Sequence, residues 1–125
     1  MEYLWVGLGG FVGANARYAL TGFVVRRLGS GFPYGTLIIN VSGSLLIGLV
    51  LTLLVERFVT DPAWRLLLVV GFLGGYTTFS SYSFEAIALI EDGEWGRAVA
   101  YVVGSNLLGL AACFGGIALA RGLAR

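Results

Sequence analysis

The sequence predicts an all-α membrane protein with four transmembrane helices. Of the 125 residues, 58% are hydrophobic and 12% are charged, whereas an average soluble domain has about 25% charged residues. The mean hydropathy is +0.87. Because one spanning helix needs about 20 apolar residues, roughly four crossings use the whole chain. We therefore expect a single four-helix transmembrane domain over residues 1–125.

Four apolar segments account for these crossings, and each is bounded by a turn-forming or charged stretch. A Gly-Ser-Gly-Phe-Pro turn at 29–33 follows the first segment, and Thr60-Asp61-Pro62 is a start signal for the third. Glu91-Asp92-Gly93-Glu94 closes the third segment. Both prolines lie outside the segments, as stable helices prefer. The segments cover residues 3–25, 34–55, 63–90 and 95–119.

The charged and reactive residues exclude several classes of function. All eight cationic residues are arginines, the formal net charge is +1 and histidine is absent, so neither a nucleic-acid surface nor a histidine metal site is indicated. The single Cys113 permits no disulfide within the chain and is most simply a packing residue. Glu2 leads directly into an apolar run, without the features of a cleaved signal peptide, so we expect the first helix to be retained. We also expect no enzyme, since no nucleophile, base and orienting group recur together.

The arginines are almost evenly divided between the two ends of the predicted bundle. Three lie on the side of the first and third loops, four lie on the opposite side, and Arg17 within the first helix evens the count. Because arginine-rich loops set the orientation of a membrane protein, this balance allows insertion both ways round. The alternative is that so few arginines give a noisy count. The two sets are Arg26, Arg27 and Arg97, and Arg57, Arg65, Arg121 and Arg125.

Two of the predicted helices carry polar or small residues four positions apart, which places each set along one helix face. Uncharged amide and hydroxyl donors can solvate a small anion without trapping it, whereas a cation route would show carboxylates. A mid-membrane asparagine such as Asn40 is therefore a functional candidate, and a hydrogen bond that serves only helix assembly is the alternative. The sets are Thr36, Asn40, Ser44 and Gly48, and Tyr101, Ser105, Gly109 and Cys113, with Asn106 on an adjacent face.

The third segment contains the stretch GGYTTFSSYSFE at residues 74–85. Two glycines followed by two threonines weaken helix continuity, so we expect a break near the middle of the membrane. Backbone carbonyls exposed there must be satisfied by protein or a polar cavity, and they are good ligands for a hard cation. Phe79 and Tyr82 share a face of the following half-helix. The positive edge of an aromatic ring can favour an anion, although such a pair more often forms core.

Glu85 is a carboxylate inside the third segment. A carboxylate at this depth indicates a protonation site, a partner for Arg17 or a cap at a water-filled vestibule. Structural pairing is the simplest of these interpretations.

Together these residues resemble the Fluc-type fluoride channels, also called CrcB proteins. The resemblance covers nearly the whole chain and rests on Gly-Ala-Asn-Ala-Arg-Tyr at 13–18, Phe-Pro-Tyr-Gly-Thr at 32–36, Asn-Val-Ser-Gly-Ser at 40–44 and the stretch at 74–85. It implies an antiparallel, dual-topology homodimer with two fluoride pores along the subunit interface. It also implies passive, fluoride-selective export across a bacterial inner membrane.

The resemblance assigns roles to individual residues. A structural Na⁺ at the dimer centre would be held by the backbone carbonyls of Gly74 and Thr77, while Arg17 and Glu85 are structural or vestibule candidates. Three positions depart from the family pattern: Tyr82 replaces a phenylalanine, and Gly109 and Cys113 stand where hydroxyl residues are frequent. The implied fluoride pathway consists of Thr36, Asn40, Phe79, Tyr82, Tyr101, Ser105 and Cys113.

Two other classes of function remain as alternatives. A proton-coupled small-cation exporter of the small multidrug resistance type also has four helices, but it needs a membrane-embedded glutamate in its first helix. Here Glu2 lies at the extreme end of that helix and Glu85 lies in the third. The other alternative is an assembly subunit that conducts no ion by itself.

Overall fold

A computed structural model describes residues 1–57 and 61–123, and every regular element within these ranges is helical. Thr60, part of the predicted start of the third segment, and Arg125, one of the arginines counted for orientation, lie outside these ranges. The elements are α1 (Glu2–Leu28), α2 (Tyr34–Glu56), α3 (Pro62–Arg65), the π-helix η1 (Leu66–Leu73), α4 (Gly74–Tyr76), α5 (Phe79–Glu91) and α6 (Trp95–Leu123).

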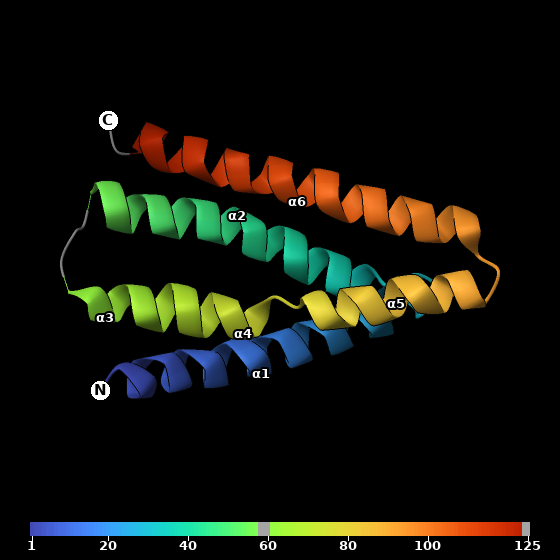
Figure 1. Cartoon of the computed structure of the whole chain (residues 1–125), viewed down its shortest axis with the longest axis horizontal. Helices are drawn as coiled ribbons and strands as arrows, with labels where there is room; N and C mark the ends of the chain where they lie inside the picture. Colours follow the sequence, from blue (N-terminus) through green and yellow to red (C-terminus); the bar gives the residue numbers. More distant parts are fainter. Residues whose placement is uncertain (58–60, 124–125) are drawn as a thin grey trace.

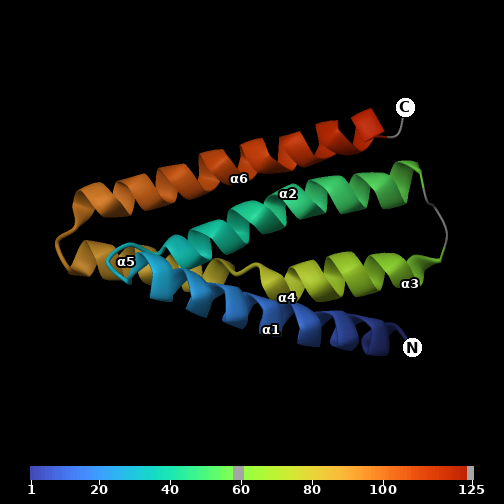
Figure 2. The same cartoon turned by 180° about the vertical axis from the view of Figure 1, so that it is seen from behind.

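The helices make four antiparallel passes, of which the third consists of α3, η1, α4 and α5 (Figures 1 and 2). The first residue lies at the same end as the start of α3 and the end of α6 (Figure 1). Within the described ranges, three helices are long and apolar enough to cross a membrane: Tyr34–Glu56, Pro62–Glu91 and Trp95–Leu123. A crossing by α1, which has 27 residues, remains a prediction.

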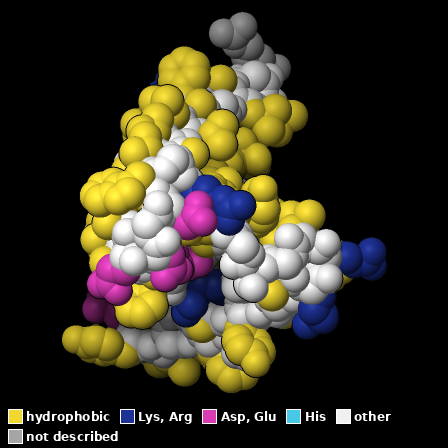
Figure 3. All heavy atoms as spheres, turned by 90° about the vertical axis from the view of Figure 1, so that its right-hand side faces the viewer, with side chains coloured by type: hydrophobic (Ala, Val, Ile, Leu, Met, Phe, Trp, Pro, Cys, Tyr) yellow, Lys and Arg dark blue, Asp and Glu magenta, His cyan; other side chains and the backbone are white. Residues whose placement is uncertain are grey.

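The ends of the helices follow the signals in the sequence. Gly29 and Gly93 adopt positive φ values of 80° and 76° in the two turns at one end of the bundle, a conformation that glycine adopts at little cost. Asp61 caps α3 by accepting a hydrogen bond from Ala63 N at 2.9 Å. At the end that carries both glycine turns, charged side chains gather among hydrophobic ones (Figure 3).

The predicted break in the third pass is confirmed, but it lies later than the glycines. Gly74 and Gly75 are helical, whereas Thr77 and Thr78 are extended, with ψ values of 158° and 119°. The preceding eight residues form the π-helix η1, which sequence reasoning did not anticipate. Gly75 instead serves close helix packing, because a Cβ there would lie 2.9 Å from the Gly10 carbonyl oxygen.

Glycines also let the passes approach one another backbone to backbone. A Cβ on Gly9 would collide with the Leu67 carbonyl oxygen, and one on Gly48 would collide with the Cys113 carbonyl oxygen. The first contact joins α1 to η1, and the second joins α2 to α6. Consequently α1 is held close to the third pass, and α2 is held close to α6.

We predict that Gly9→Ala lowers the free energy of unfolding in detergent by about 1–3 kcal/mol, because the new methyl group meets backbone atoms that cannot move aside. Gly7→Ala is the matched control, since a Cβ at Gly7 meets nothing within 4 Å. Denaturant titration of both variants measures the difference. Equal stability of the two would contradict the close packing of α1 on η1.

Candidate functional site

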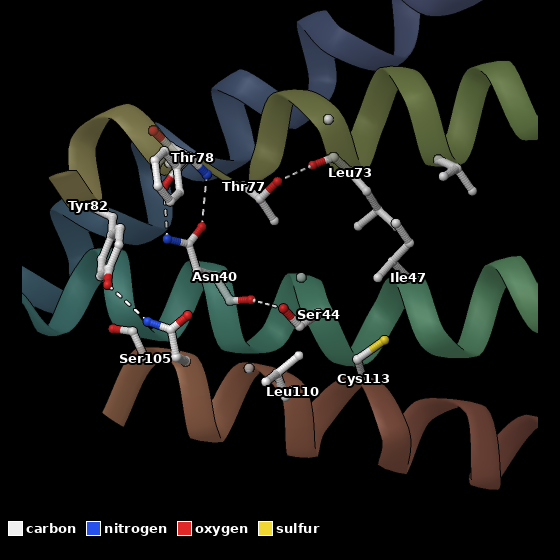
Figure 4. A pocket seen from close by; sticks show the side chains of 16 residues that line it. Asn40, Ser44, Ile47, Leu73, Thr77, Thr78, Tyr82, Ser105, Leu110 and Cys113 are labelled. Atoms are coloured by element: carbon white, nitrogen blue, oxygen red, sulfur yellow. Dashed lines mark hydrogen bonds between the residues drawn. The ribbon is translucent and has the colours of Figure 1, made fainter. Parts of the chain in front are cut away.

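A groove of about 520 Å³ lies beside the break and is lined by residues from α2, α6 and the third pass (Figure 4). It brings together seven of the residues to which the resemblance assigns a pathway or metal-binding role, although they lie as far as 73 positions apart, from 40 to 113. The two polar faces predicted on the second and fourth segments therefore meet in one place. The seven residues are Asn40, Gly74, Thr77, Phe79, Tyr82, Ser105 and Cys113.

Thr36 and Glu85 lie in a second, smaller pocket of about 220 Å³. Thr36 Oγ1 donates a hydrogen bond of 2.6 Å to Glu85 Oε1. Tyr101 is completely buried, and its ring centroid lies 5.3 Å from that of Tyr82, which lines the groove. Of the predicted pathway residues, five line the groove, Thr36 lines the smaller pocket, and Tyr101 lines neither but contacts the ring of Tyr82.

Arg17 does not pair with Glu85, so this interpretation of the two charges is wrong. Instead, Arg17 Nε donates to the Gly75 carbonyl oxygen at 3.0 Å. The reason is the packing of α1 against α4, which places Arg17 beside the last helical turn before the break rather than beside α5. Glu85 obtains a structural partner from α2, namely Thr36.

Asn40 holds the extended backbone at the break through both ends of its amide. Its Oδ1 accepts from Thr78 N at 2.8 Å, and its Nδ2 donates to the Thr78 carbonyl oxygen at 2.9 Å (Figure 4). Unpaired backbone groups inside a membrane protein are costly, so this pair of bonds stabilises the interruption of the helix. The amide nitrogen keeps a second hydrogen for other partners.

The carbonyls of Gly74 and Thr77 lose their helical donors for an identifiable reason. Thr78 N–H donates to Asn40 instead of to the Gly74 carbonyl, four residues earlier. Likewise, Ser81 N–H donates at 3.2 Å to the side chain of Thr78, which caps α5, instead of to the Thr77 carbonyl. Free carbonyl oxygens of this kind suit a hard cation such as Na⁺. Within the described residues no cluster of three or more His, Cys, Asp or Glu side chains could hold a metal.

The aromatic pair lies on one wall of the groove. The ring centroids of Phe79 and Tyr82 are 5.5 Å apart at an interplanar angle of 52°. Phe79 is 78% exposed, so it borders the groove without facing another wall of this chain. Two hydroxyls are buried without a hydrogen-bond partner among the described residues, those of Ser105 in the groove and of Tyr101 behind it.

Sequence reasoning missed two residues of the site. Thr78 caps α5 and binds Asn40, and a Thr-Phe-Ser-Ser stretch after two glycines could have signalled this N-cap. Asn106 was placed beside the polar face of the fourth segment without a role. In the structure it lines the groove and donates to the Tyr82 hydroxyl at 3.1 Å. No pattern in the sequence pairs these two residues.

The fold and site define an α-helical membrane protein with a largely apolar groove that carries a few neutral polar side chains beside a broken helix, and comparison with known proteins agrees. Residues 4–117 match the family model described as CrcB-like protein, Camphor Resistance (CrcB), and the chain belongs to this family. It is an integral membrane protein of the bacterial inner membrane.

Three bacterial relatives carry the printed name fluoride-specific ion channel FluC. The Koribacter versatilis protein is 50% identical over 122 residues, which cover 98% of this chain and 97% of the relative. The Solibacter usitatus protein is 51% identical over 121 residues, 97% and 99% of the two chains. The Thermus thermophilus protein is 50% identical over 122 residues, 98% and 95%.

We predict that Asn40→Leu lowers the free energy of unfolding by about 2–5 kcal/mol, because it leaves Thr78 N–H and C=O without partners at the break. Asn15→Leu is the control, since Asn15 is exposed and bonds its own helix, at the Phe11 carbonyl oxygen. Denaturant titration in detergent compares the two. A loss no larger than that of the control would show that Asn40 does not stabilise the break.

Proposed function

We propose that the protein is a passive, fluoride-selective ion channel that exports fluoride through two pores at the interface of an antiparallel homodimer. The observation that carries this proposal is the groove of neutral donors at the helix break, in a chain about half identical, over nearly its whole length, to proteins named fluoride-specific ion channels. Each groove would form one wall of a pore, and a second copy would supply the other.

The chemistry of the groove suits a small anion. Its described lining contains no Asp, Glu, Lys or Arg side chain, so an anion would be neither repelled by a carboxylate nor trapped by a fixed cation. Fluoride is strongly hydrated, and amide and hydroxyl donors can replace the lost water. The Asn40 amide and the Tyr82 and Ser105 hydroxyls would do this, with Thr36, Tyr101 and Cys113 extending the path.

The open side of the groove supports a dimer as the conducting unit. Phe79 is 78% exposed at its edge, and Leu110, another lining residue, is 71% exposed. A pore that excludes water and chloride must cover such side chains. The balanced arginines of the sequence are compatible with two copies inserted in opposite orientations.

The same dimer would carry a structural Na⁺ at its centre. The carbonyl oxygens of Gly74 and Thr77 from each copy would hold the ion, because their helical donors are bound elsewhere. The ion would fix the two breaks against each other and would not be transported.

We expect purified protein in liposomes to release fluoride rapidly and chloride slowly. An ion electrode records the fluoride efflux, and chloride-loaded liposomes are the control. Proton-driven transport of a small cation without fluoride efflux would favour the small-cation exporter, while no transport of any ion would favour the assembly subunit.

We predict that Phe79→Ile abolishes fluoride efflux, because isoleucine lacks the positive ring edge that Phe79 presents at the groove. Phe84→Ile is the matched control: Phe84 lies on the same helix, is 75% exposed and does not line the groove. Both variants are reconstituted at equal density. Unchanged efflux through Phe79→Ile would remove the ring from the conduction mechanism.

A further inference from the structure

Asn106 forms a bridge between the backbone of α6 and the side chain of Tyr82 on α5. Its Nδ2 donates at 2.8 Å to the Val102 carbonyl oxygen, one turn earlier, and at 3.1 Å to the Tyr82 hydroxyl. An amide nitrogen carries two hydrogens, so these bonds use both of them. Tyr82, on α5, is thereby hydrogen-bonded to α6, which forms another wall of the groove.

The Val102 carbonyl fixes the direction of both bonds. A carbonyl oxygen only accepts, so it requires the nitrogen of the amide, and not its oxygen, to point toward it. The same nitrogen then faces Tyr82, and the Tyr82 oxygen must accept. Since Asn106 has taken a lone pair of the phenol oxygen, the phenol proton remains available to another acceptor.

Two further observations place the Tyr82 side chain at the groove. Tyr82 and Asn106 both line it, and so does the neighbouring Ser105, whose buried hydroxyl has no partner among the described residues. The Tyr82 ring packs between Phe79 and Tyr101, with centroid separations of 5.5 Å and 5.3 Å. The ring is therefore confined, and the hydroxyl contact decides mainly where its proton points.

We propose that Asn106 is a positioning residue that holds the Tyr82 hydroxyl as an acceptor, so that its proton is presented to an anion in the groove. The inference rests on the proposed fluoride channel and assigns to Asn106 a part in its selectivity. Compared with phenylalanine at this position, Tyr82 presents an O–H group, which is a stronger donor than the positive edge of the ring. Asn106 keeps this O–H from turning toward α6. The pair acts as one unit, so each residue needs the other.

A double-mutant cycle tests this unit. The variants are Asn106→Leu, Tyr82→Phe and the two combined, each reconstituted in liposomes. We expect either single change to lower fluoride efflux and the fluoride-over-chloride ratio about five- to tenfold, the size of one lost hydrogen bond. The combined variant should be no worse than either single variant, since the second change removes a contact that is already gone.

The control is Asn15→Leu, which removes the same type of bond, from an asparagine side chain to the carbonyl four residues earlier, on α1. It should leave the selectivity ratio unchanged in both the unaltered and the Tyr82→Phe protein. Asn106→Ala serves as a second variant in case the leucine does not fold. Because folding defects change the amount of active protein and not the ratio between ions, the ratio isolates positioning from structure.

Additive losses in the combined variant, or an Asn106→Leu effect that persists in the Tyr82→Phe background, would overturn this inference while leaving the channel intact. A starting protein that moves no fluoride would overturn the proposed function and this inference with it. A non-additive loss of selectivity in a conducting protein supports both.

Discussion

The structure depends on the requirement that backbone polar groups inside a membrane find partners within the protein. In the third pass the helical backbone hydrogen bonds are interrupted at Thr77 and Thr78, where the backbone is extended. Three side chains meet the demand: Asn40 binds the N–H and C=O of Thr78, Arg17 binds the Gly75 carbonyl, and the Thr78 hydroxyl receives Ser81 N–H. The break persists because other helices supply what its own helix no longer can.

This demand explains why the helices pack so closely. Arg17 reaches the break from α1 and Asn40 reaches it from α2, so both helices must approach the third pass within side-chain distance. Glycines on α1 and on the third pass allow this, since a Cβ on Gly75 would come within 2.9 Å of the Gly10 carbonyl oxygen. In a bilayer, where lipid is as apolar as the helices, such contacts are a main source of association. The glycine contacts and the polar contacts at the break thus support each other.

Composition and turn signals predicted the ends of the helical passes to within four residues, because apolar runs of about 20 residues have few alternatives in a membrane. The residue types also predicted that the break would exist and that Asn40 would matter. They did not predict which partner each polar group would find. A pairing of Arg17 with Glu85 was one of three interpretations of the carboxylate, whereas α1 places Arg17 at Gly75. No partner was assigned to Asn106, which contacts Tyr82 where α6 packs on α5. Such pairings depend on helix rotation, which local sequence does not determine.

The break also separates hydrogen-bond donors from acceptors. Asn40 and the Thr78 hydroxyl take the N–H groups and leave the Gly74 and Thr77 carbonyls without their helical donors. In the same groove, the hydroxyls of Ser105 and Tyr82 have protons that no described residue accepts. Carbonyl oxygens suit a cation and hydroxyl protons suit an anion. One interruption of a helix can therefore create both kinds of site, provided that neutral side chains hold the backbone donors in place.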